Sequence, residues 1–304
     1  MIFFYEFLLY NIRVEEDFMI KLFACDLDGT LLNDEHEFDE IIFNAIDAVI
    51  KEGKYFSFAT GRHMHAQQIK ILKYEKRDVF MVCMNGALIL DPSQNIIYDR
   101  KMDKKIVKDL LETFPEIDFD CIGKDHVFIR ANRQEHLDQF SRSSIWNRAA
   151  NKWKIEDFIK DSIFDQSIDD ILSHDIYKIN CRLSDAKTIE KMNCYLDQHK
   201  DEIVNAPYDN GAFEITGKDV NKGNAVAWLC EYLHLQEDEV AVYGDGGNDI
   251  EMLERFKHSY GMSNGMESAK KAANEIIGCC KDYAVSKHIL ETLQKEKDNK
   301  HPPA

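Results

Sequence analysis

The 304-residue sequence lacks a C-x-x-C pair, an apolar run long enough to span a bilayer, and an excess of basic residues. Several of its eight cysteines lie inside apolar runs, which indicates buried free thiols in a reducing cytoplasm rather than disulfides. Asp and Glu number 55 against 38 Lys and Arg, and the formal net charge of −17 argues against a nucleic-acid polymer as partner. We therefore expect a cytoplasmic protein that binds neither nucleic acid nor membrane.

The composition is otherwise that of a folded protein with a substantial core. Hydrophobic residues make up 44% of the chain, which includes 18 Phe and 12 Tyr. The sequence shows no internal repeat and no low-complexity tract. A chain of this length favours two moderate domains over one very large core.

The N-terminal segment, residues 1–18, is apolar but does not have the features of a signal peptide. It has no basic region at its start and no small-residue cleavage site, and Glu6 interrupts its apolar stretch. Met19 opens a natural first strand. We therefore interpret residues 1–18 as an extension upstream of the folded protein, with an N-terminal helix packed on the body as the alternative.

Strands alternate with helices from Met19 onward. The run "KLFACDL" is typical of a buried parallel strand, and "EFDEIIFNAIDAVIKEG" has helical spacing. "YFSFATGR" and "DVFMVCMNGALIL" predict further strands, and the alternation resumes at "GAFEIT", "NKGNAVAWLCEYLHL" and "EVAVYGDGGND". This pattern predicts the α/β class, with a doubly wound, Rossmann-like parallel sheet.

The pattern changes between these two blocks. "GALILDPSQNIIYDR" predicts a β-hairpin, because two short strands flank an Asp-Pro-Ser-Gln-Asn turn. The residues that follow mix helices with short strands, which suggests an α+β insert on an antiparallel sheet. We expect a discontinuous core, residues 19–101 and 206–304, interrupted by a cap domain over residues 102–205.

Three apolar strands end in polar, glycine-containing loops: "DLDGT" at 26–30, "TGR" at 60–62 and "GDGGND" at 244–249. In an open parallel sheet the ligand crevice lies beyond the carboxyl ends of the strands, so these loops should converge. Asp26, Asp28, Asp245 and Asp249 would then share one small space. A hard cation must balance these carboxylates, and Mg²⁺ suits an oxygen-only ligand set that retains waters.

The two aspartates of "DLDGT" suit two different tasks. Asp26, at the end of the strand, can ligate the metal and attack a phosphorus atom. Asp28 can give a proton to the leaving oxygen and then take one from the water that hydrolyses the aspartyl phosphate. Gly29 permits a sharp turn, and its amide and that of Leu27 could donate to phosphate oxygens.

Two further groups are candidates for neutralising a phosphoryl group. They are the hydroxyl of Thr60 and the ammonium of Lys222, the latter at a helix start where backbone amides also face an anion. A protein with a net negative charge needs such local positive charge to bind a phosphate.

Each motif also has a plainer interpretation when it is taken alone. "DLDGT" could be a loop with Asx-turn hydrogen bonds, and "TGR" is nearly uninformative. "GDGGND" could be a turn or a calcium loop, although it lacks the later glutamate of an EF-hand. The catalytic interpretation is favoured because each member of the ordered set falls at a strand end or a helix start.

Together these motifs resemble those of the haloacid dehalogenase superfamily, and within it the Cof-type phosphatases with a large α/β cap. The matching stretches are "DLDGTLL", "TGR", "KG" in "VNKGNAV" and "GDGGNDIEML". "MNGALI" and "FEIT" also resemble stretches that flank the cap in this family. The resemblance extends from Met19 to about Leu293.

The resemblance implies a role for each aspartate. Asp26 would be the nucleophile and Asp28 the acid/base. Mg²⁺ would be held by Asp26, the backbone carbonyl of Asp28, and Asp245, with Asp249 supporting the metal shell through water.

The resemblance also implies which residues surround the phosphate. This phosphate-binding set comprises Thr60, Gly61, Arg62, Lys222 and Asn248, beside the amides of Leu27 and Gly29. Arg62 and Asn85 would face the substrate or the cap interface.

The expected function is that of a Mg²⁺-dependent phosphatase of small phosphorylated metabolites, such as sugar phosphates, nucleotides or cofactor phosphates. Two alternatives stay open: a phosphomutase of sugar phosphates on the same fold, and a non-catalytic protein that binds phosphorylated metabolites. The sequence leaves the individual substrate and the oligomeric state undetermined.

Overall fold

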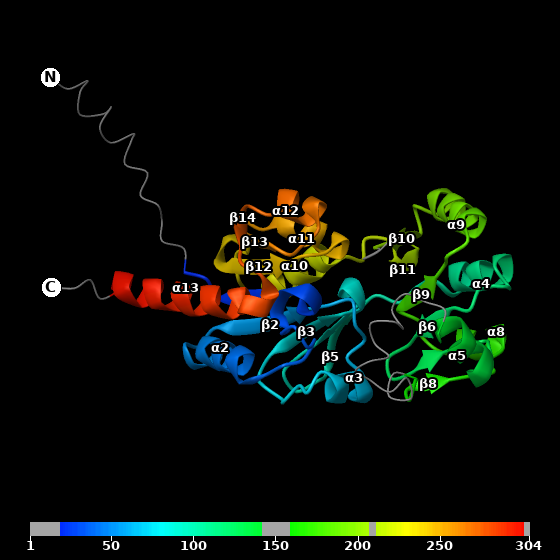
Figure 1. The fold of residues 1–304 in the computed structure, drawn as a ribbon, viewed down its shortest axis with the longest axis horizontal. Helices are drawn as coiled ribbons and strands as arrows, with labels where there is room; N and C mark the ends of the chain where they lie inside the picture. The colour runs from blue at the N-terminus through cyan, green and yellow to red at the C-terminus, as the bar shows by residue number, and fades with distance from the viewer. Residues whose placement is uncertain (1–18, 142–158, 207–210, 301–304) are drawn as a thin grey trace, which may run out of the picture.

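The computed structural model describes residues 19–141, 159–206 and 211–300, and Figure 1 shows two bodies side by side. The larger body is built on an eight-stranded sheet, of which six neighbouring strands are parallel. Across the sheet the order is β14 (Glu275–Ile277), β13 (His258–Met262), β12 (Val240–Gly244), β1 (Leu22–Cys25), β2 (Tyr55–Ala59), β3 (Phe80–Cys83), β4 (Leu88–Leu90) and β5 (Ile96–Asp99).

Helices cover both faces of this sheet. One face packs against α2 (Glu40–Lys51), α3 (Ala66–Ile71) and α13 (Ala284–Lys300). The other packs against α10 (Lys222–Tyr232), α11 (Ile250–Arg255) and α12 (Glu267–Ala272). The predicted doubly wound α/β core is confirmed.

The start of α2 illustrates how local sequence sets these elements. The side chain of Asp39 accepts hydrogen bonds from the amides of Ile41 and Ile42, which caps the helix. Apolar residues at helical spacing then face the sheet and are buried: Ile42, Phe43, Ile46 and Val49. The helix is therefore held by its cap at one end and by its apolar stripe along its length.

The predicted hairpin is present, because β4 pairs antiparallel with both β3 and β5. It leads into the smaller body, here called the cap, whose mainly antiparallel sheet has six strands. Their order is β10 (Ile203–Asn205), β11 (Ala212–Gly217), β9 (Lys178–Arg182), β6 (Asp120–Ile122), β7 (Val127–Phe128) and β8 (Ser162–Ile163). The cap helices are α4 (Lys104–Thr113), α5 (Arg133–Ser141), α8 (Ile168–Leu172) and α9 (Ala186–Gln198).

The end of the cap differs from the prediction. The expected boundary at residue 205 assigned "GAFEIT" to the core, but this stretch forms β11, which lies between β9 and β10 in the cap sheet. Its apolar side chains Phe213 and Ile215 belong to the cap's own hydrophobic cluster. The parallel core therefore resumes after Gly217. A strand of alternating apolar and polar residues joins the sheet in which its apolar face is buried, and for β11 this is the cap sheet.

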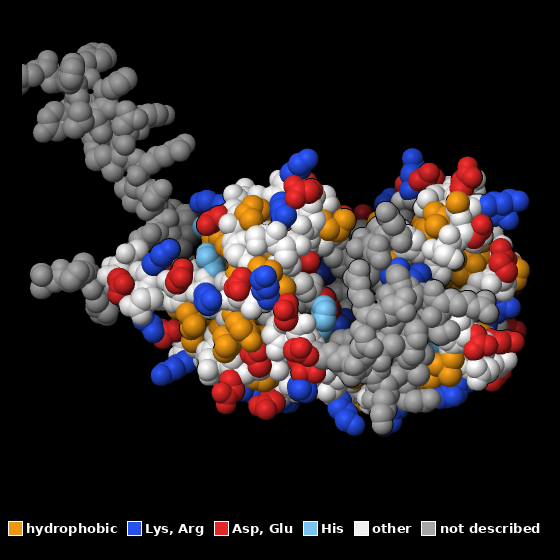
Figure 2. Space-filling model, viewed as in Figure 1, with side chains coloured by type: hydrophobic (Ala, Val, Ile, Leu, Met, Phe, Trp, Pro, Cys, Tyr) orange, Lys and Arg blue, Asp and Glu red, His pale blue; other side chains and the backbone are white. Residues whose placement is uncertain are grey.

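Residues 1–18 lie outside the described residues, so their interpretation as an extension stays a prediction. No helix within the described ranges is long and apolar enough to cross a membrane. All eight cysteines are free thiols. On the face shown in Figure 2, acidic and basic side chains are interspersed over both bodies.

Candidate active site

The site lies at the point where the strand order of the large sheet reverses. From β1 the chain proceeds to β2 and β3 on one side, whereas β12, β13 and β14 extend on the other. Asp26 directly follows β1, and Asp245 directly follows β12, the neighbouring parallel strand. A crevice at such a reversal is where ligands bind in open α/β sheets, so the fold brings the predicted loops to one place.

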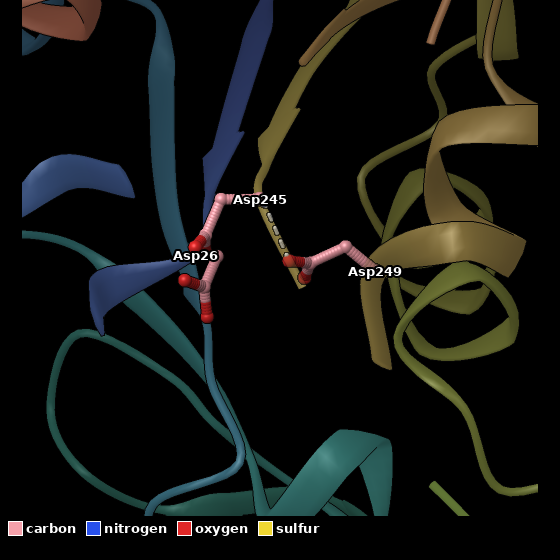
Figure 3. Close-up of side chains that lie close together, drawn as sticks. All are labelled: Asp26, Asp245 and Asp249. Carbon is pink, nitrogen blue, oxygen red and sulfur yellow. Dashed lines mark hydrogen bonds between the residues drawn. The ribbon is translucent and has the colours of Figure 1, made fainter. Parts of the chain in front are cut away.

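Three of the four predicted aspartates form a cluster. Asp26, Asp245 and Asp249 each offer a carboxylate oxygen, and these oxygens lie within 4.8 Å of one another (Figure 3). Burial raises the pKa of Asp26 well above its ordinary value, and it raises the pKa of Asp245 to about 6. The neighbouring carboxylates of the cluster add to this effect, although Lys222 opposes it.

Asp249 is held in place by the backbone of its own loop. Its Oδ2 accepts hydrogen bonds from the amides of Asp245 and Gly246, each at 2.9 Å. Its Oδ1 accepts a hydrogen bond from Lys222 at 2.7 Å. Both oxygens of Asp249 are therefore engaged, which suits a residue that organises the site rather than one that contacts a ligand directly.

Lys222 begins α10 and is 0% exposed. Its ammonium lies 2.6 Å from Asp26 Oδ1 and also contacts Asp249. Burial alone would lower the pKa of Lys222, but the Asp249 and Asp26 carboxylates together raise it above its ordinary value. The lysine is thus a fixed cation beside Asp26, and its predicted role in binding a phosphate stays a prediction.

Asp28 is placed differently from the other three aspartates. Its carboxylate accepts two hydrogen bonds from Arg62, at 2.6 Å from Nε and 2.8 Å from Nη2, and His36 lies 3.2 Å away. Burial would raise the pKa of Asp28, but the Arg62 guanidinium outweighs it and holds this pKa well below its usual range. The expectation that all four carboxylates share one cation is therefore corrected: the side chain of Asp28 is paired with Arg62.

Gly29 is required by the geometry of the first loop. Its φ of +81° lies in the left-handed region, and a Cβ there would come within 2.4 Å of Asp245 Oδ2. The next residue, Thr30, donates its hydroxyl to Asp245 Oδ1 at 3.0 Å. Thr30 is a site residue that the sequence reasoning missed, although it stands inside the quoted motif "DLDGTLL".

The second loop places Thr60 at the end of β2. The Thr60 amide bonds to the carbonyl of Val82 at 2.8 Å, which continues the pairing with β3. The amide of Arg62 donates to Thr60 Oγ1 at 3.1 Å. The hydroxyl therefore already accepts a hydrogen bond, and its own hydrogen remains for a ligand oxygen.

Asn248 contacts another predicted residue. Its side-chain amide donates to Asn85 Oδ1 at 3.0 Å, and Asn85 in turn donates to Glu214 of the cap at 2.6 Å. Glu214 also binds Lys178 of the cap. The sequence reasoning did not assign roles to Glu214 and Lys178; the only available signal was the quoted stretch "FEIT", which contains Glu214.

The residues present fit a divalent cation. The only cation in contact with the three clustered carboxylates among the described residues is Lys222, so excess negative charge remains. Oxygen atoms from carboxylates are the ligands that Mg²⁺ prefers, and a cation at this position would lower the raised pKa values of Asp26 and Asp245. Asp26 and Asp245 are the side chains that would hold it.

Comparison with known proteins supports the same interpretation. The family model described as haloacid dehalogenase-like hydrolase matches residues 23–289. The 5-amino-6-(5-phospho-D-ribitylamino)uracil phosphatase YbjI of Escherichia coli is 25% identical over 281 residues, which cover 91% of this chain and 97% of that protein. The HMP-PP phosphatase of Citrobacter koseri is 26% identical over 290 residues, covering 94% and 98%.

A solved structure supports the fold. A haloacid dehalogenase-like hydrolase from B. subtilis superimposes with a TM-score of 0.75, covering 89% of this chain and 99% of that one. At 23% identity this similarity concerns the fold alone.

Proposed function

Because the chain belongs to the haloacid dehalogenase-like hydrolases and is a phosphatase of that family, we propose that it hydrolyses small phosphorylated metabolites with Mg²⁺ through an aspartyl phosphate. The observation that carries the proposal is the buried cluster of Asp26, Asp245 and Asp249 with Lys222 against it. Chemistry on a phosphate needs a nucleophile and fixed positive charge at the same place, and this cluster supplies both.

Asp26 is the nucleophile in this proposal. Its Oδ1 is held by Lys222, so Oδ2 is the oxygen that attacks phosphorus. The bond from Oδ2 to phosphorus forms while the bond from phosphorus to the leaving oxygen breaks, and the leaving oxygen keeps the electron pair and takes a proton. Water then attacks phosphorus, the Asp26–phosphorus bond breaks, and orthophosphate leaves.

Asp28 carries the proton in both steps. It gives a proton to the leaving oxygen in the first step and takes one from the attacking water in the second. The pairing with Arg62 keeps Asp28 ionised, which suits the second step. We expect an arriving phosphate ester to draw Arg62 toward itself, which would release Asp28 to carry a proton in the first step.

The remaining predicted residues bind the phosphoryl oxygens in this proposal. Thr60 offers its hydroxyl hydrogen, Lys222 its charge, and the loop of Gly61 its backbone. The amides of Leu27 and Gly29, in the loop after β1, and the side chain of Asn248, in the loop after β12, complete this set.

Mg²⁺, when bound, supplies electrostatic stabilisation of the charge that develops on the phosphoryl group. Asp26 and Asp245 would hold it with the backbone carbonyl of Asp28, and Asp249 would support this arrangement. Thr30 keeps Asp245 oriented by its hydrogen bond. These residues surround the phosphoryl group alone, so they do not select among phosphorylated metabolites.

The test is orthophosphate release from a panel of sugar phosphates, nucleotides and pyridoxal phosphate, each with Mg²⁺ and with EDTA. We expect release from at least one class, and only with Mg²⁺. An isomeric sugar phosphate without orthophosphate would indicate the phosphomutase alternative. A rise in melting temperature with orthophosphate, without turnover of any compound, would indicate the binding-protein alternative.

A further inference from the structure

The cap places a buried ion pair against the catalytic core. Lys178 on β9 is 1% exposed, and its ammonium lies 3.0 Å from Glu214 Oε1 on the adjacent strand β11. The alternating residues of these strands, Ile179, Phe213 and Ile215, pack in the hydrophobic cluster on the opposite side of the cap sheet. Lys178 and Glu214 therefore lie on the polar face of that sheet.

This ion pair is hydrogen-bonded to the core. Lys178 Nζ donates to the carbonyl of Gly61 at 2.7 Å, and Glu214 Oε2 accepts from Asn85 Nδ2 at 2.6 Å. Asn85 also accepts from Asn248 at 3.0 Å. A Cβ on Gly61 would lie 2.9 Å from Asn85 Oδ1, so the contact leaves no room for a side chain there. Two cap residues thus bind the loop after β2 and, through Asn85, the loop after β12.

The contact with Gly61 fixes one peptide group of the phosphate-binding loop. The carbonyl of Gly61 and the amide of Arg62 belong to the same trans peptide, so they point in opposite directions. Lys178 holds the carbonyl, and the amide donates to Thr60 Oγ1 at 3.1 Å. Rotation of this peptide would remove the hydrogen bond that directs the Thr60 hydroxyl.

We propose that Lys178 and Glu214 are positioning residues for phosphoryl transfer: the docked cap orients the Gly61–Arg62 peptide and, through it, the hydroxyl of Thr60. The inference rests on the proposed function, in which Thr60 binds the phosphoryl group of the substrate. Stability alone does not require this buried ion pair, because a protein is often as stable when apolar residues of similar volume replace such a pair. Its donors and acceptors are instead matched to groups of the catalytic loops.

The chain offers a matched control in Lys54. Its ammonium also binds one backbone carbonyl, that of Ile20, and one glutamate, Glu296, at 2.5 Å. This second pair ties β2 and α13 together at the end of the sheet away from Asp26. The two lysines therefore have the same kinds of partner and differ in their distance from the site.

The experiment compares Lys178→Met, Lys178→Met/Glu214→Gln and Lys54→Met with the wild type. Melting temperature, kcat and KM for p-nitrophenyl phosphate with Mg²⁺, and the affinity for orthophosphate are measured for each. We expect Lys178→Met to lower kcat about 10- to 100-fold and to weaken orthophosphate binding. Lys54→Met should lower the melting temperature while kcat and KM stay as in the wild type.

The double variant separates positioning from stability. Removal of both charges should restore the melting temperature, because no unpaired charge stays buried, while kcat stays low because the Gly61 carbonyl still lacks its donor. Recovery of wild-type kcat in the double variant, or unchanged kcat and orthophosphate affinity in Lys178→Met, would overturn the inference. If the wild type binds orthophosphate but hydrolyses no substrate, the proposed function fails. The orthophosphate affinities of the variants then decide the inference alone.

Discussion

Asp26→Asn is expected to abolish orthophosphate release from every substrate that the wild type hydrolyses. The amide is a poor nucleophile, so we expect kcat to fall about a thousandfold or more, or about 4 kcal/mol of transition-state stabilisation. The fold should remain, because burial raises the pKa of Asp26 and its ionised form therefore costs stability in the folded state. Steady-state kinetics and thermal unfolding of the purified variant measure both effects.

The control for this change is Asp47→Asn. Asp47 lies on the exposed side of α2 and pairs with Arg77 on the surface, so its substitution should leave kcat and KM unchanged. Residual turnover of Asp26→Asn within tenfold of the wild type would mean that another group attacks phosphorus, and Asp26 would then lose the role proposed for it.

Lys222→Met is expected to cause the largest combined loss of activity and stability. The methionine has a similar length but no charge, so Asp26 and Asp249 would stay buried without their cation. Removal of one partner from a buried ion pair costs about 3 to 5 kcal/mol of unfolding free energy. We also expect kcat/KM to fall at least about a hundredfold, because the lysine faces the charge that develops on the phosphoryl group. Urea unfolding and steady-state kinetics give the two values.

Two further variants show whether these losses arise at the site. Lys222→Met/Asp249→Asn should recover part of the stability, because one uncompensated carboxylate is removed, but should stay inactive. Lys54→Met, which breaks a partly buried pair elsewhere, should lose stability only. Wild-type kcat/KM in Lys222→Met would contradict the assignment of Lys222 to the phosphate.

Local patterns in the sequence predicted the core and the clustered carboxylates. Apolar runs that end in "DLDGT" and "GDGGND" place Asp26 and Asp245 at the carboxyl ends of strands, and the parallel order of β1 and β12 makes these ends neighbours. The positions of Asp249 and Lys222 could also be predicted, because Asp249 lies in the loop after β12 and Lys222 begins α10. These features depend on short segments whose spacing is visible in the chain.

Partners that come from distant strands could not be predicted in the same way. Asp28 pairs with Arg62 because the loops after β1 and β2 lie close together. The spacing of residues along the chain does not predict this pairing. Lys178 and Glu214 reach the site because the cap turns the polar face of its sheet to the core. The boundary at residue 205 was wrong because an alternating strand such as "GAFEIT" fits either sheet until its pairing is known.

The most direct test of the account is to trap the phosphorylated enzyme. Asp28→Asn should slow the second step, because the attacking water loses its base, whereas p-nitrophenyl phosphate has a leaving group that needs little help from an acid. After rapid quenching, mass spectrometry of the digested protein should find one phosphoryl group on the peptide that contains Asp26. A phosphoryl group on another peptide, or none while p-nitrophenol is released in a burst, would contradict an aspartyl phosphate at Asp26.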